Sequence, residues 1–461
     1  MRLSNKIMQT YRGSATLPRY NRSDLTAGVL HIGVGAFHRA HQAVYIDSLL
    51  KDSPNWGIIG VSMQNTSTRS ALGPQDCLYS VGVRDAGNIS VRVIGSLMSL
   101  QQGGEAAIAA IADPRIRLVT LTVTEKGYVG GGSANALGQT LVAGLAQRAR
   151  NGAPALTILS CDNLTNNGGR TQELVHATAH VLAPEILRYI EQSVSFPSSM
   201  VDRITPATTD CDRAEIRTMA GFEDAWPVIT EPFSQWVIED KFATDRPDFE
   251  SVGVEVVGDL IPFETMKLRL LNGAHTTMAV LGSMLGLEHV SEAAHDPDLA
   301  ALIERTARTE VFPTLVQPTG ELIIYLQRLL ERFRNPAIKH MLLQIAQDSS
   351  EKVPVRLVPP FVENTIAGRP SPGLNLAIAG WIAFLRRENQ QKVQIIDPIA
   401  QTLHGLDGLP AVEVIAHLCA PGAPLNALNE MVSVQRTIKK SVQIIESGGV
   451  RAAIRMALED G

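Results

Sequence analysis

The sequence predicts an α/β N-terminal half followed by a mostly α-helical C-terminal half. From residue 28 to about residue 165, short runs rich in Val and Ile alternate with helical patterns, which is typical of βαβ units around a mainly parallel sheet. After about residue 260, strand-like runs become scarce and long helical patterns replace them. A chain of 461 residues with 45% apolar content can bury two cores of ordinary size. We expect one domain over residues 1–258 and a second over residues 259–461.

Continuous apolar runs predict the strands of the first half, because a strand of a parallel sheet is covered on both faces. In order, the runs are GVLHI, WGIIGVS, SVRVIGS, RLVTLTV and ALTILS. Between the first two, Ala43, Ile46, Leu49 and Leu50 recur at three- and four-residue steps and predict a helix that starts soon after Gly35. EAAIAAIADP predicts another helix, which its proline ends.

Helical spacing of apolar residues dominates the second half. The predicted helices are ETMKLRLLNGAHTTMAVLGSMLG, DPDLAALIERTARTEVF, GELIIYLQRLLERFRN, AIKHMLLQIAQD and LNLAIAGWIAFLRREN. Between the two halves, residues 196–258 carry prolines and mixed patterns and predict no definite element.

Composition and charge exclude several classes of function. The net charge is −5 and no basic stripe is present, so nucleic acid is not an expected partner. The cysteines lie far apart with no CxxC pair and no neighbouring His, which favours a reducing cytoplasm over a disulfide framework and predicts no metal site. No signal-like N-terminus and no long apolar run occur, so we expect neither export nor a membrane span. The sequence leaves the oligomeric state open and is compatible with a monomer.

The stretch VLHIGVGAFHRAHQ predicts a dinucleotide-binding turn between the first strand and the first helix. In such a turn the first glycine permits a tight bend, the second lets the backbone approach a pyrophosphate, and the third lets helix and strand pack closely. Gly33 and Gly35 meet the first two requirements, and His38 occupies the third position. The helix start would direct N–H groups at an anion, to which Arg39 could add charge. The alternative is an ordinary turn followed by a polar, solvated helix start.

The segment FETMKLRLLNGAHTTMAVLG carries polar residues on one face of a strongly apolar helix. At about 100° per residue, Glu264, His275 and Asn272 lie roughly 60°, 80° and 140° from Lys267. Such a stripe faces protein rather than open water, and burial of a lysine lowers its pKa. A lowered pKa is what a general base requires near neutral pH. The alternative is a structural Lys and Glu pair with a hydrogen-bonded His.

The segment ILSCDNLTNNGGR follows an apolar strand, so it lies where α/β sheets hold ligands. Asp162 and Asn163 are expected to point into that crevice, although a helix N-cap is an alternative for the same residue types. Since no zinc constellation occurs, a dehydrogenase built on this chain would stabilise an alkoxide with preorganised protein donors.

These segments resemble the mannitol dehydrogenase family of polyol-specific long-chain dehydrogenases and reductases. The segments that carry the resemblance are, in order, GVGAFHRAHQ, LTVTEKGY, SCDNL, FPSSMVDRITP, EPFSQWVIED and KLRLLNGAH. The resemblance extends through about residues 28 to 390. The resemblance implies a Rossmann-type dinucleotide-binding domain followed by a mostly helical substrate-binding domain. It also implies mannitol, arabinitol, fructuronate or tagaturonate as the kind of substrate.

The family's roles fall on particular positions of this chain. Lys267 matches the general base, Asn163 and Asn272 match an oxyanion hole, and His275 matches a residue that orients the reacting oxygen. Substrate-binding roles fall on Asp202, on Lys352 within DSSEKVPVR, and on Glu264, which matches a glutamate that passes protons between the lysine and solvent. The cofactor-binding turn would comprise Ile32, Gly33, Val34, Gly35, Ala36, Phe37, His38 and Arg39.

The reaction implied is the metal-independent, NAD-dependent oxidation of a sugar alcohol to a ketose. NADP is an alternative cofactor, because no carboxylate occurs between Ser62 and Leu72 to hold the ribose hydroxyls, and Arg69 could suit a 2′-phosphate. Reduction of fructuronate or tagaturonate is an alternative reaction, for which Arg356 or Arg369 could hold the extra carboxylate. Non-redox alternatives are an NAD-dependent glycoside hydrolase and an inactive nucleotide-binding regulator.

Overall fold

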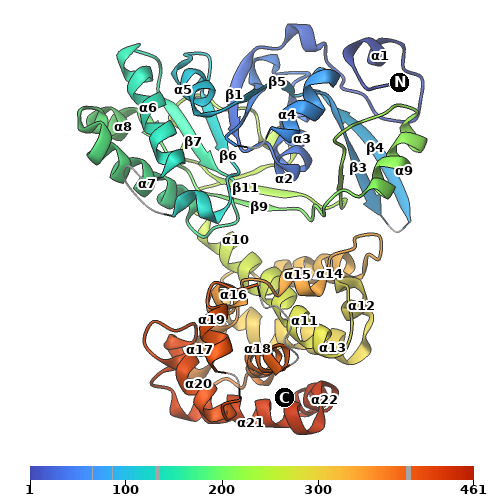
Figure 1. Ribbon diagram of the computed structural model, residues 1–461, viewed down its shortest axis with the longest axis vertical. Coiled ribbons are helices and arrows are strands. Elements are labelled where there is room, and N and C mark those ends of the chain that lie inside the picture. Colours follow the sequence, from blue (N-terminus) through green and yellow to red (C-terminus); the bar gives the residue numbers. More distant parts are fainter. Residues whose placement is uncertain (65, 86, 130–134, 391–395, 407, 461) are drawn as a thin grey trace. The chain divides into compact units, whose positions relative to one another are not determined.

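The computed structural model describes residues 1–461 apart from 65, 86, 130–134, 391–395, 407 and 461. The chain forms two compact units, Met1–Ile261 and Pro262–Gly461 (Figure 1). The first has three β-sheets with flanking helices, and the described part of the second is helical apart from an isolated bridge. The predicted α/β half and helical half are therefore confirmed.

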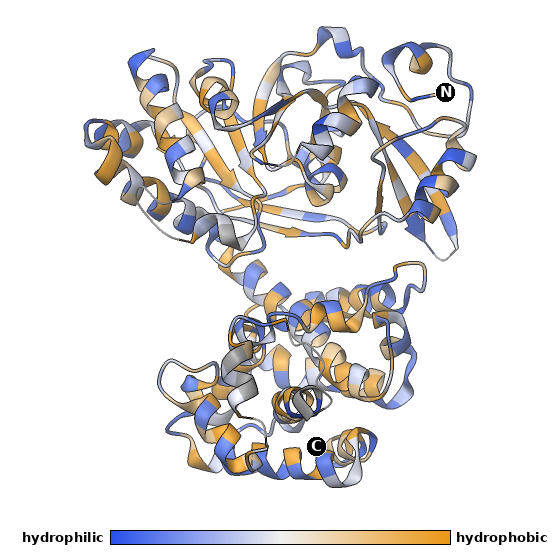
Figure 2. Ribbon diagram, viewed as in Figure 1, coloured by the Kyte–Doolittle hydropathy of each residue, from blue (hydrophilic) through white to orange (hydrophobic). Residues whose placement is uncertain are grey.

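The main sheet of the first unit has six strands in the order β5-β2-β1-β6-β7-β8, and every neighbouring pair is parallel. Numbered within this sheet, the order is 3-2-1-4-5-6, which is that of the Rossmann fold. The inner strands β1, β6 and β7 are buried at every position and appear mainly hydrophobic in Figure 2, as expected for strands covered on both faces. The strands are β1 (Ala27–Ile32), β2 (Gly57–Ser62), β5 (Leu97–Gln102), β6 (Leu118–Leu121), β7 (Leu156–Ser160) and β8 (Val194–Ser195).

Separate hydrophobic cores lie against the main sheet, which makes it doubly wound. One core contains side chains of α5, α6 and α7 together with strand residues, and another contains side chains of α3 with Trp236 and Phe249. The helices of this unit are α1 (Asn5–Thr10), α2 (Ala36–Ala40), α3 (Gln42–Leu49), α4 (Ser67–Leu72), α5 (Gly104–Ala112), α6 (Ala136–Arg150), α7 (Asn167–Leu182), α8 (Leu187–Ser193) and α9 (Asp210–Ala220).

Two strand predictions in this unit need correction. The run SVRVIGS forms β4 (Asn88–Ile94), but β4 pairs antiparallel with β3 (Tyr79–Asp85) in a second sheet. Its outer half is partly exposed, which suits an antiparallel strand with one solvated face. The third strand of the main sheet is instead β5, whose sequence LMSLQQ carries no long apolar run because β5 lies at the sheet edge.

Residues 196–258, which the sequence leaves unassigned, contribute to both small sheets. Strand β10 (Val228–Thr230) pairs parallel with β3. A third sheet has the order β12-β11-β9, with β9 (Ser199–Asp202) antiparallel and β12 (Glu255–Val257) parallel to β11 (Gln235–Glu239). Short strands in a region rich in prolines give a weak periodic signal, because each is too brief to show alternation.

The second unit packs its helices around one large apolar core. The predicted helix AIKHMLLQIAQD is mostly wrong, because residues 340–342 pair their backbone with residues 288–290 instead. The helices are α10 (Ile261–Met266), α11 (Gly273–Met284), α12 (Val290–His295), α13 (Pro297–Thr306), α14 (Thr319–Arg334), α15 (Leu342–Ile345), α16 (Ser349–Arg356), α17 (Val358–Ile366), α18 (Pro372–Gln390), α19 (Ala400–Gly405), α20 (Ala411–Cys419), α21 (Val432–Gly448) and α22 (Val450–Glu459).

Two stretches of this unit are π-helical rather than α-helical. They are Lys267–Asn272, which joins α10 to α11, and Ala307–Val311, which follows α13. Within the described ranges, every helix is too short or too polar to cross a lipid bilayer.

Candidate active site

The turn after β1 requires glycine at its first position. Gly33 has a φ of +99°, and a Cβ atom there would lie 2.1 Å from the carbonyl oxygen of Thr122. The Gly33 N–H donates to Val61 O at 2.9 Å, and the Thr122 hydroxyl donates to Gly33 O at 2.7 Å. At Gly35, the residue before α2, the nearest atom to an added Cβ is 3.8 Å away. The space beside Gly35 is therefore open, as a close approach of a ligand to the backbone requires.

His38 fills the position of the missing third glycine by stacking on a histidine of β1. The rings of His38 and His31 are nearly parallel, with centroids 3.3 Å apart. His31 in turn is held by the hydroxyls of Thr120 and Thr122, at 2.8 and 2.9 Å. Both histidines are buried. A pair of flat rings thus replaces the close helix-to-strand packing that glycine gives elsewhere.

Arg39 is also buried, but its guanidinium is used for structure. It donates to the carbonyl of Trp226 and lies 5.4 Å from the centre of the Tyr79 ring. The Tyr79 hydroxyl donates to Arg39 O at 2.9 Å. Because its guanidinium is engaged in these contacts, they do not support the expectation that the Arg39 side chain attracts a bound anion. Only the Arg39 backbone is then left for the predicted cofactor contact. Phe37 stacks on His41, with centroids 5.0 Å apart.

The two polar residues after β7 have different surroundings. Asp162 is buried and accepts hydrogen bonds from the N–H groups of Val123 and Thr124, at 3.1 and 2.8 Å, and from the Tyr128 hydroxyl at 2.7 Å. Burial raises the pKa of Asp162, and these hydrogen bonds oppose the rise. Asp162 therefore organises the loop after β6. Asn163, by contrast, is exposed at the strand end.

Asn167 is a positioning residue that sequence reasoning missed. Its side chain is fully buried, and its amide donates to Asp162 O at 3.0 Å and to Ser199 O at 2.8 Å. It also accepts from the Ser199 N–H at 3.0 Å. Asn167 thereby fixes the end of β7 against β9, the strand that carries buried Asp202. The doubled asparagine in CDNLTNNGG was the available signal.

The second unit contributes Lys267 and Asn272, which begin and end the π-helical stretch. Gly273 N–H donates to Leu268 O, five residues back, which is the π pattern. In an α-helix residues five apart differ by about 140°, whereas in a π-helix they are joined by the i→i+5 hydrogen bond and lie on the same side of the helix. The α-helical angles expected from the sequence are therefore wrong here. Lys267 and Asn272 are both buried, and they are the first and last residues of the π stretch.

His275 lies just beyond, in the first turn of α11. Its ring packs on Phe333 and against His340, with centroids 4.6 and 5.4 Å apart. Nε2 of His275 is buried and has no hydrogen-bond partner among the described residues. Burial lowers the pKa of His275 well below its ordinary value. Groups that carry or can carry positive charge lower it further: His340, Arg332, Arg356 and Lys267.

The remaining predicted residues of this unit lie on α10 and α16. Glu264 is half-buried, one helical turn before Lys267. Lys352 on α16 donates through its ammonium group to Ile345 O at 3.1 Å and to Gln347 O at 2.5 Å. The structure thus groups Glu264, Lys267, Asn272 and His275 along one continuous helical segment. The other predicted residues, Asn163, Asp202 and the turn after β1, belong to the first unit.

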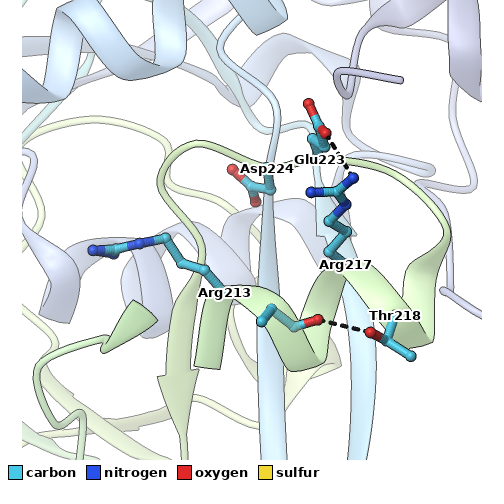
Figure 3. A pocket seen from close by; sticks show the side chains of 6 residues that line it. Arg213, Arg217, Thr218, Glu223 and Asp224 are labelled. Atoms are coloured by element: carbon cyan, nitrogen blue, oxygen red, sulfur yellow. Dashed lines mark hydrogen bonds and ion pairs between the residues drawn. The ribbon is translucent and has the colours of Figure 1, made fainter. Parts of the chain in front are cut away.

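Two further observations concern other kinds of site. Among the described residues, no group of three or more His, Cys, Asp or Glu side chains could hold a metal ion. A hollow of about 490 Å³ is lined by residues of α9 and the turn after it (Figure 3). Its cations are already paired, Arg217 with Glu223 at 3.2 Å and Arg213 with Asp210 at 3.1 Å. It contains none of the predicted site residues.

The parallel sheet with its glycine turn defines a Rossmann-class protein. Residues 27–251 match the family description "Mannitol dehydrogenase Rossmann domain", and residues 259–443 match "Mannitol dehydrogenase C-terminal domain". The chain therefore belongs to the mannitol dehydrogenase family, and it is an oxidoreductase.

Individual relatives agree with this assignment. The chain is 36% identical to a mannitol 2-dehydrogenase of Phaeosphaeria nodorum, over 96% of this chain and 83% of the relative. It is 34% identical to the D-mannonate oxidoreductase of Escherichia coli, over 89% of this chain and 92% of the relative. Among solved structures, the Pseudomonas fluorescens mannitol 2-dehydrogenase, in a ternary complex with NAD and D-mannitol, superposes with a TM-score of 0.88 at 33% identity, over the full length of both chains.

Proposed function

We propose that this protein is an NAD-dependent, metal-independent dehydrogenase that interconverts a secondary alcohol and a ketone on a straight-chain sugar alcohol or sugar acid. Lys267 serves as the general base. The observation that carries the proposal is the segment from Lys267 to His275. It holds a buried lysine and a buried imidazole with an unpartnered Nε2, eight residues apart on one helical path.

The turn after β1 fits NAD. Gly33 adopts a conformation that side chains avoid, and the space beside Gly35 is open. The N–H groups at the start of α2 have no intrahelical acceptor and suit a pyrophosphate. NAD, when bound, accepts a hydride from the carbon that bears the hydroxyl. NAD is favoured over NADP because the Pseudomonas fluorescens relative was solved with NAD.

The protein's own groups handle the proton and the oxygen. Neutral Lys267 takes the proton of the substrate hydroxyl, and Glu264, half-buried one turn away, passes it towards solvent. His275 donates through Nε2 to the reacting oxygen, which gives that buried atom a partner. Asn272 donates to the same oxygen as negative charge develops on it. In the reverse direction, protonated Lys267 is the acid that completes reduction of the ketone.

The reacting carbon does not decide which substrate is used. Two of the relatives are named for mannitol and for mannonate. These two molecules differ at one end of the carbon chain, where mannitol has a hydroxyl and mannonate has a carboxylate. Mannitol or arabinitol was the expectation from the sequence, with fructuronate and tagaturonate as alternatives.

A Lys267→Met variant tests the proposal. We expect the turnover number to fall about 10²- to 10⁴-fold, because general base catalysis contributes that much. The dissociation constant of NADH, measured by fluorescence titration, should stay within about twofold, because the glycine turn would still hold the cofactor. A Lys440→Met variant, which changes an exposed lysine of α21, is the matched control. Wild-type turnover by Lys267→Met would rule out the assigned base.

A further inference from the structure

A buried histidine of β1 lies at the centre of a row of hydrogen bonds that reaches the glycine turn. Nδ1 of His31 is 2.8 Å from the hydroxyl oxygen of Thr120 on β6. Nε2 of His31 is 2.9 Å from the hydroxyl oxygen of Thr122 and 3.2 Å from Gly33 O. The Thr122 hydroxyl in turn donates to Gly33 O at 2.7 Å. None of these three side chains was a candidate from the sequence.

The hydrogen bonds of this row run in one direction. A threonine hydroxyl has a single hydrogen, and Thr122 donates it to Gly33 O. The Thr122 oxygen therefore accepts from His31 Nε2, which carries the ring hydrogen. Burial lowers the pKa of His31 to about 3, so at neutral pH the ring is uncharged and its Nδ1 accepts from the Thr120 hydroxyl. We use the name threonine–histidine relay for Thr120, His31 and Thr122, in this order of donation.

The relay ends on the carbonyl group that sets the course of the glycine turn. Gly33 O also accepts from the Gly35 N–H at 2.7 Å, and the Gly33 N–H donates to Val61 O of β2 at 2.9 Å. Gly33 is thus tied to β2 through its N–H and to the end of β6 through its carbonyl, and these are the two neighbours of β1 in the sheet. Because a trans peptide is planar, a carbonyl held towards Thr122 turns the following N–H, that of Val34, the opposite way.

The ring of His38 fixes the plane of the His31 ring. The two ring planes are 12° apart, with centroids 3.3 Å apart. The torsion that rotates a histidine ring has only a broad preference of its own, so packing has to hold both nitrogens of His31 towards their threonines. A glycine in place of His38 would leave this face of the ring uncovered. The residue that replaces the third glycine therefore supports the relay.

We propose that the threonine–histidine relay is a positioning device of the cofactor site, which through Gly33 O holds the turn in the conformation that binds the pyrophosphate of NAD. This inference rests on the proposed function and makes His31, Thr120 and Thr122 positioning residues. Glycines leave a free turn many backbone conformations, and a site that has to order its own backbone on binding loses affinity. The relay supplies that order before the cofactor binds.

Loss of one hydroxyl tests the relay with little change of shape. Thr122→Val replaces the hydroxyl with a methyl group, whereas Thr122→Ser keeps the hydroxyl. The dissociation constant of NADH, measured by fluorescence titration, should rise at least about fivefold in Thr122→Val, because the last hydrogen bond of the relay is lost. It should stay within about twofold of the wild-type value in Thr122→Ser. Circular dichroism checks that each variant is folded at the temperature of the titration.

Thr230→Val is the matched control for Thr122→Val. Thr230 lies on β10 in the second sheet, and its buried hydroxyl also donates to a backbone carbonyl, that of Ile204, at 2.9 Å. The control therefore loses the same kind of hydrogen bond away from the turn. We expect its dissociation constant for NADH to stay within about twofold of the wild-type value, even where its thermal stability falls.

The tautomer of His31 gives a second measurement that needs no cofactor. Nitrogen-15 NMR of histidine-labelled protein at neutral pH should show His31 with its hydrogen on Nε2, and His31→Phe and Thr122→Val, which each change this signal, assign it. A hydrogen on Nδ1, or unchanged NADH binding by Thr122→Val, would overturn the relay and leave the proposed function intact. Failure of the wild type to bind NADH would instead overturn the proposed function, and the cofactor role of the relay with it, whichever tautomer is found.

Discussion

Single residues of the turn after β1 have different physical tasks, although two of them are the same amino acid. Gly33 is needed for its backbone conformation and for the space that Thr122 O occupies. Gly35 is needed only if something approaches its backbone. His38 shows that the third glycine of such a turn can be replaced when strand β1 supplies a ring to stack on.

Alanine at each glycine separates folding from cofactor binding. Gly33→Ala should lower the free energy of unfolding of the first unit by at least about 2 kcal/mol, because of the positive φ and the overlap with Thr122 O. Gly35→Ala should change it by less than about 0.5 kcal/mol and yet weaken NADH binding at least about tenfold, because its methyl group would stand where the pyrophosphate approaches. Urea unfolding and NADH fluorescence measure the two effects. Normal NADH binding by Gly35→Ala would place the pyrophosphate elsewhere.

The stacked histidines should make the first unit sensitive to acid. Burial lowers the pKa of His31 to about 3 and that of His38 well below its ordinary value. The charge of Arg39 lowers the pKa of His38 further. The unfolded chain binds these protons below about pH 6.5 and the folded chain does not. The contribution of the two uncharged histidines to the unfolding free energy is therefore complete above that pH. It is lost as the pH falls, by up to about 1.4 kcal/mol per pH unit for each histidine.

A His38→Phe variant tests this acid sensitivity, because phenylalanine keeps a flat ring and cannot be protonated. Between pH 7 and about pH 5, the unfolding free energy of the first unit should fall less steeply in the variant than in the wild type. His180→Gln, which changes an exposed residue of α7, is the control and should retain the wild-type slope. Identical slopes for His38→Phe and wild type would contradict the prediction.

Among the elements, the π-helical stretch Lys267–Asn272 has the clearest bearing on chemistry. It begins at Lys267 and ends at Asn272, and Arg269 within it anchors it to its surroundings. The Arg269 guanidinium binds both carboxylate oxygens of Glu363 on α17, at 2.6 and 2.8 Å, and donates to Thr314 O at 2.7 Å. A paired contact of this kind fixes geometry more firmly than a single hydrogen bond.

Removal of the Arg269 anchor should affect catalysis through the position of Lys267. In Arg269→Leu we expect kcat to fall about tenfold, since a misplaced base loses proximity, and KM to change little. The unfolding free energy should fall by about 1–3 kcal/mol. Arg308→Leu breaks the more exposed ion pair with Glu304 at 2.9 Å. It should lower the unfolding free energy by less than about 0.5 kcal/mol and leave kcat unchanged. A tenfold fall of kcat in both variants would show that Arg269 has no special positioning role.

At the scale of the whole molecule, the chain divides its tasks between two units with separate cores. The first carries the glycine turn that fits NAD, and the second carries Lys267, Asn272 and His275. Because a ligand stabilises the part of the protein that it binds, the two tasks can be told apart by hydrogen exchange.

NADH alone should slow amide exchange mainly in the first unit, around residues 32–40 and the end of β2. At 100 times its dissociation constant, NADH should stabilise the binding region by about 2.7 kcal/mol. Addition of the substrate, mannitol or mannonate, should then slow exchange in residues 264–276. Protection confined to the second unit on addition of NADH alone would contradict this division of tasks.

The amino-acid sequence by itself determined the two-part architecture, the strands of the buried sheet and the positions of the glycine turn and the lysine segment. Those features depend on local patterns, because buried parallel strands are continuously apolar and a turn with positive φ selects glycine. The family resemblance, carried by short motifs in order, was confirmed for the same reason. The edge strand β5 and the short strands of residues 196–258 were missed, since their identity depends on neighbours far along the chain.

Only the tertiary structure decided what individual polar side chains do. Asp162, expected in a crevice, instead accepts hydrogen bonds from the loop after β6, and buried Arg39 binds the carbonyl of Trp226. Arg356 and Arg369 were equivalent in the sequence, and contacts with Thr276 and Asn364 separate them. Hydrogen-bond partners and charges that are distant in sequence set these roles, because a buried polar group must pair with whatever the fold places within reach.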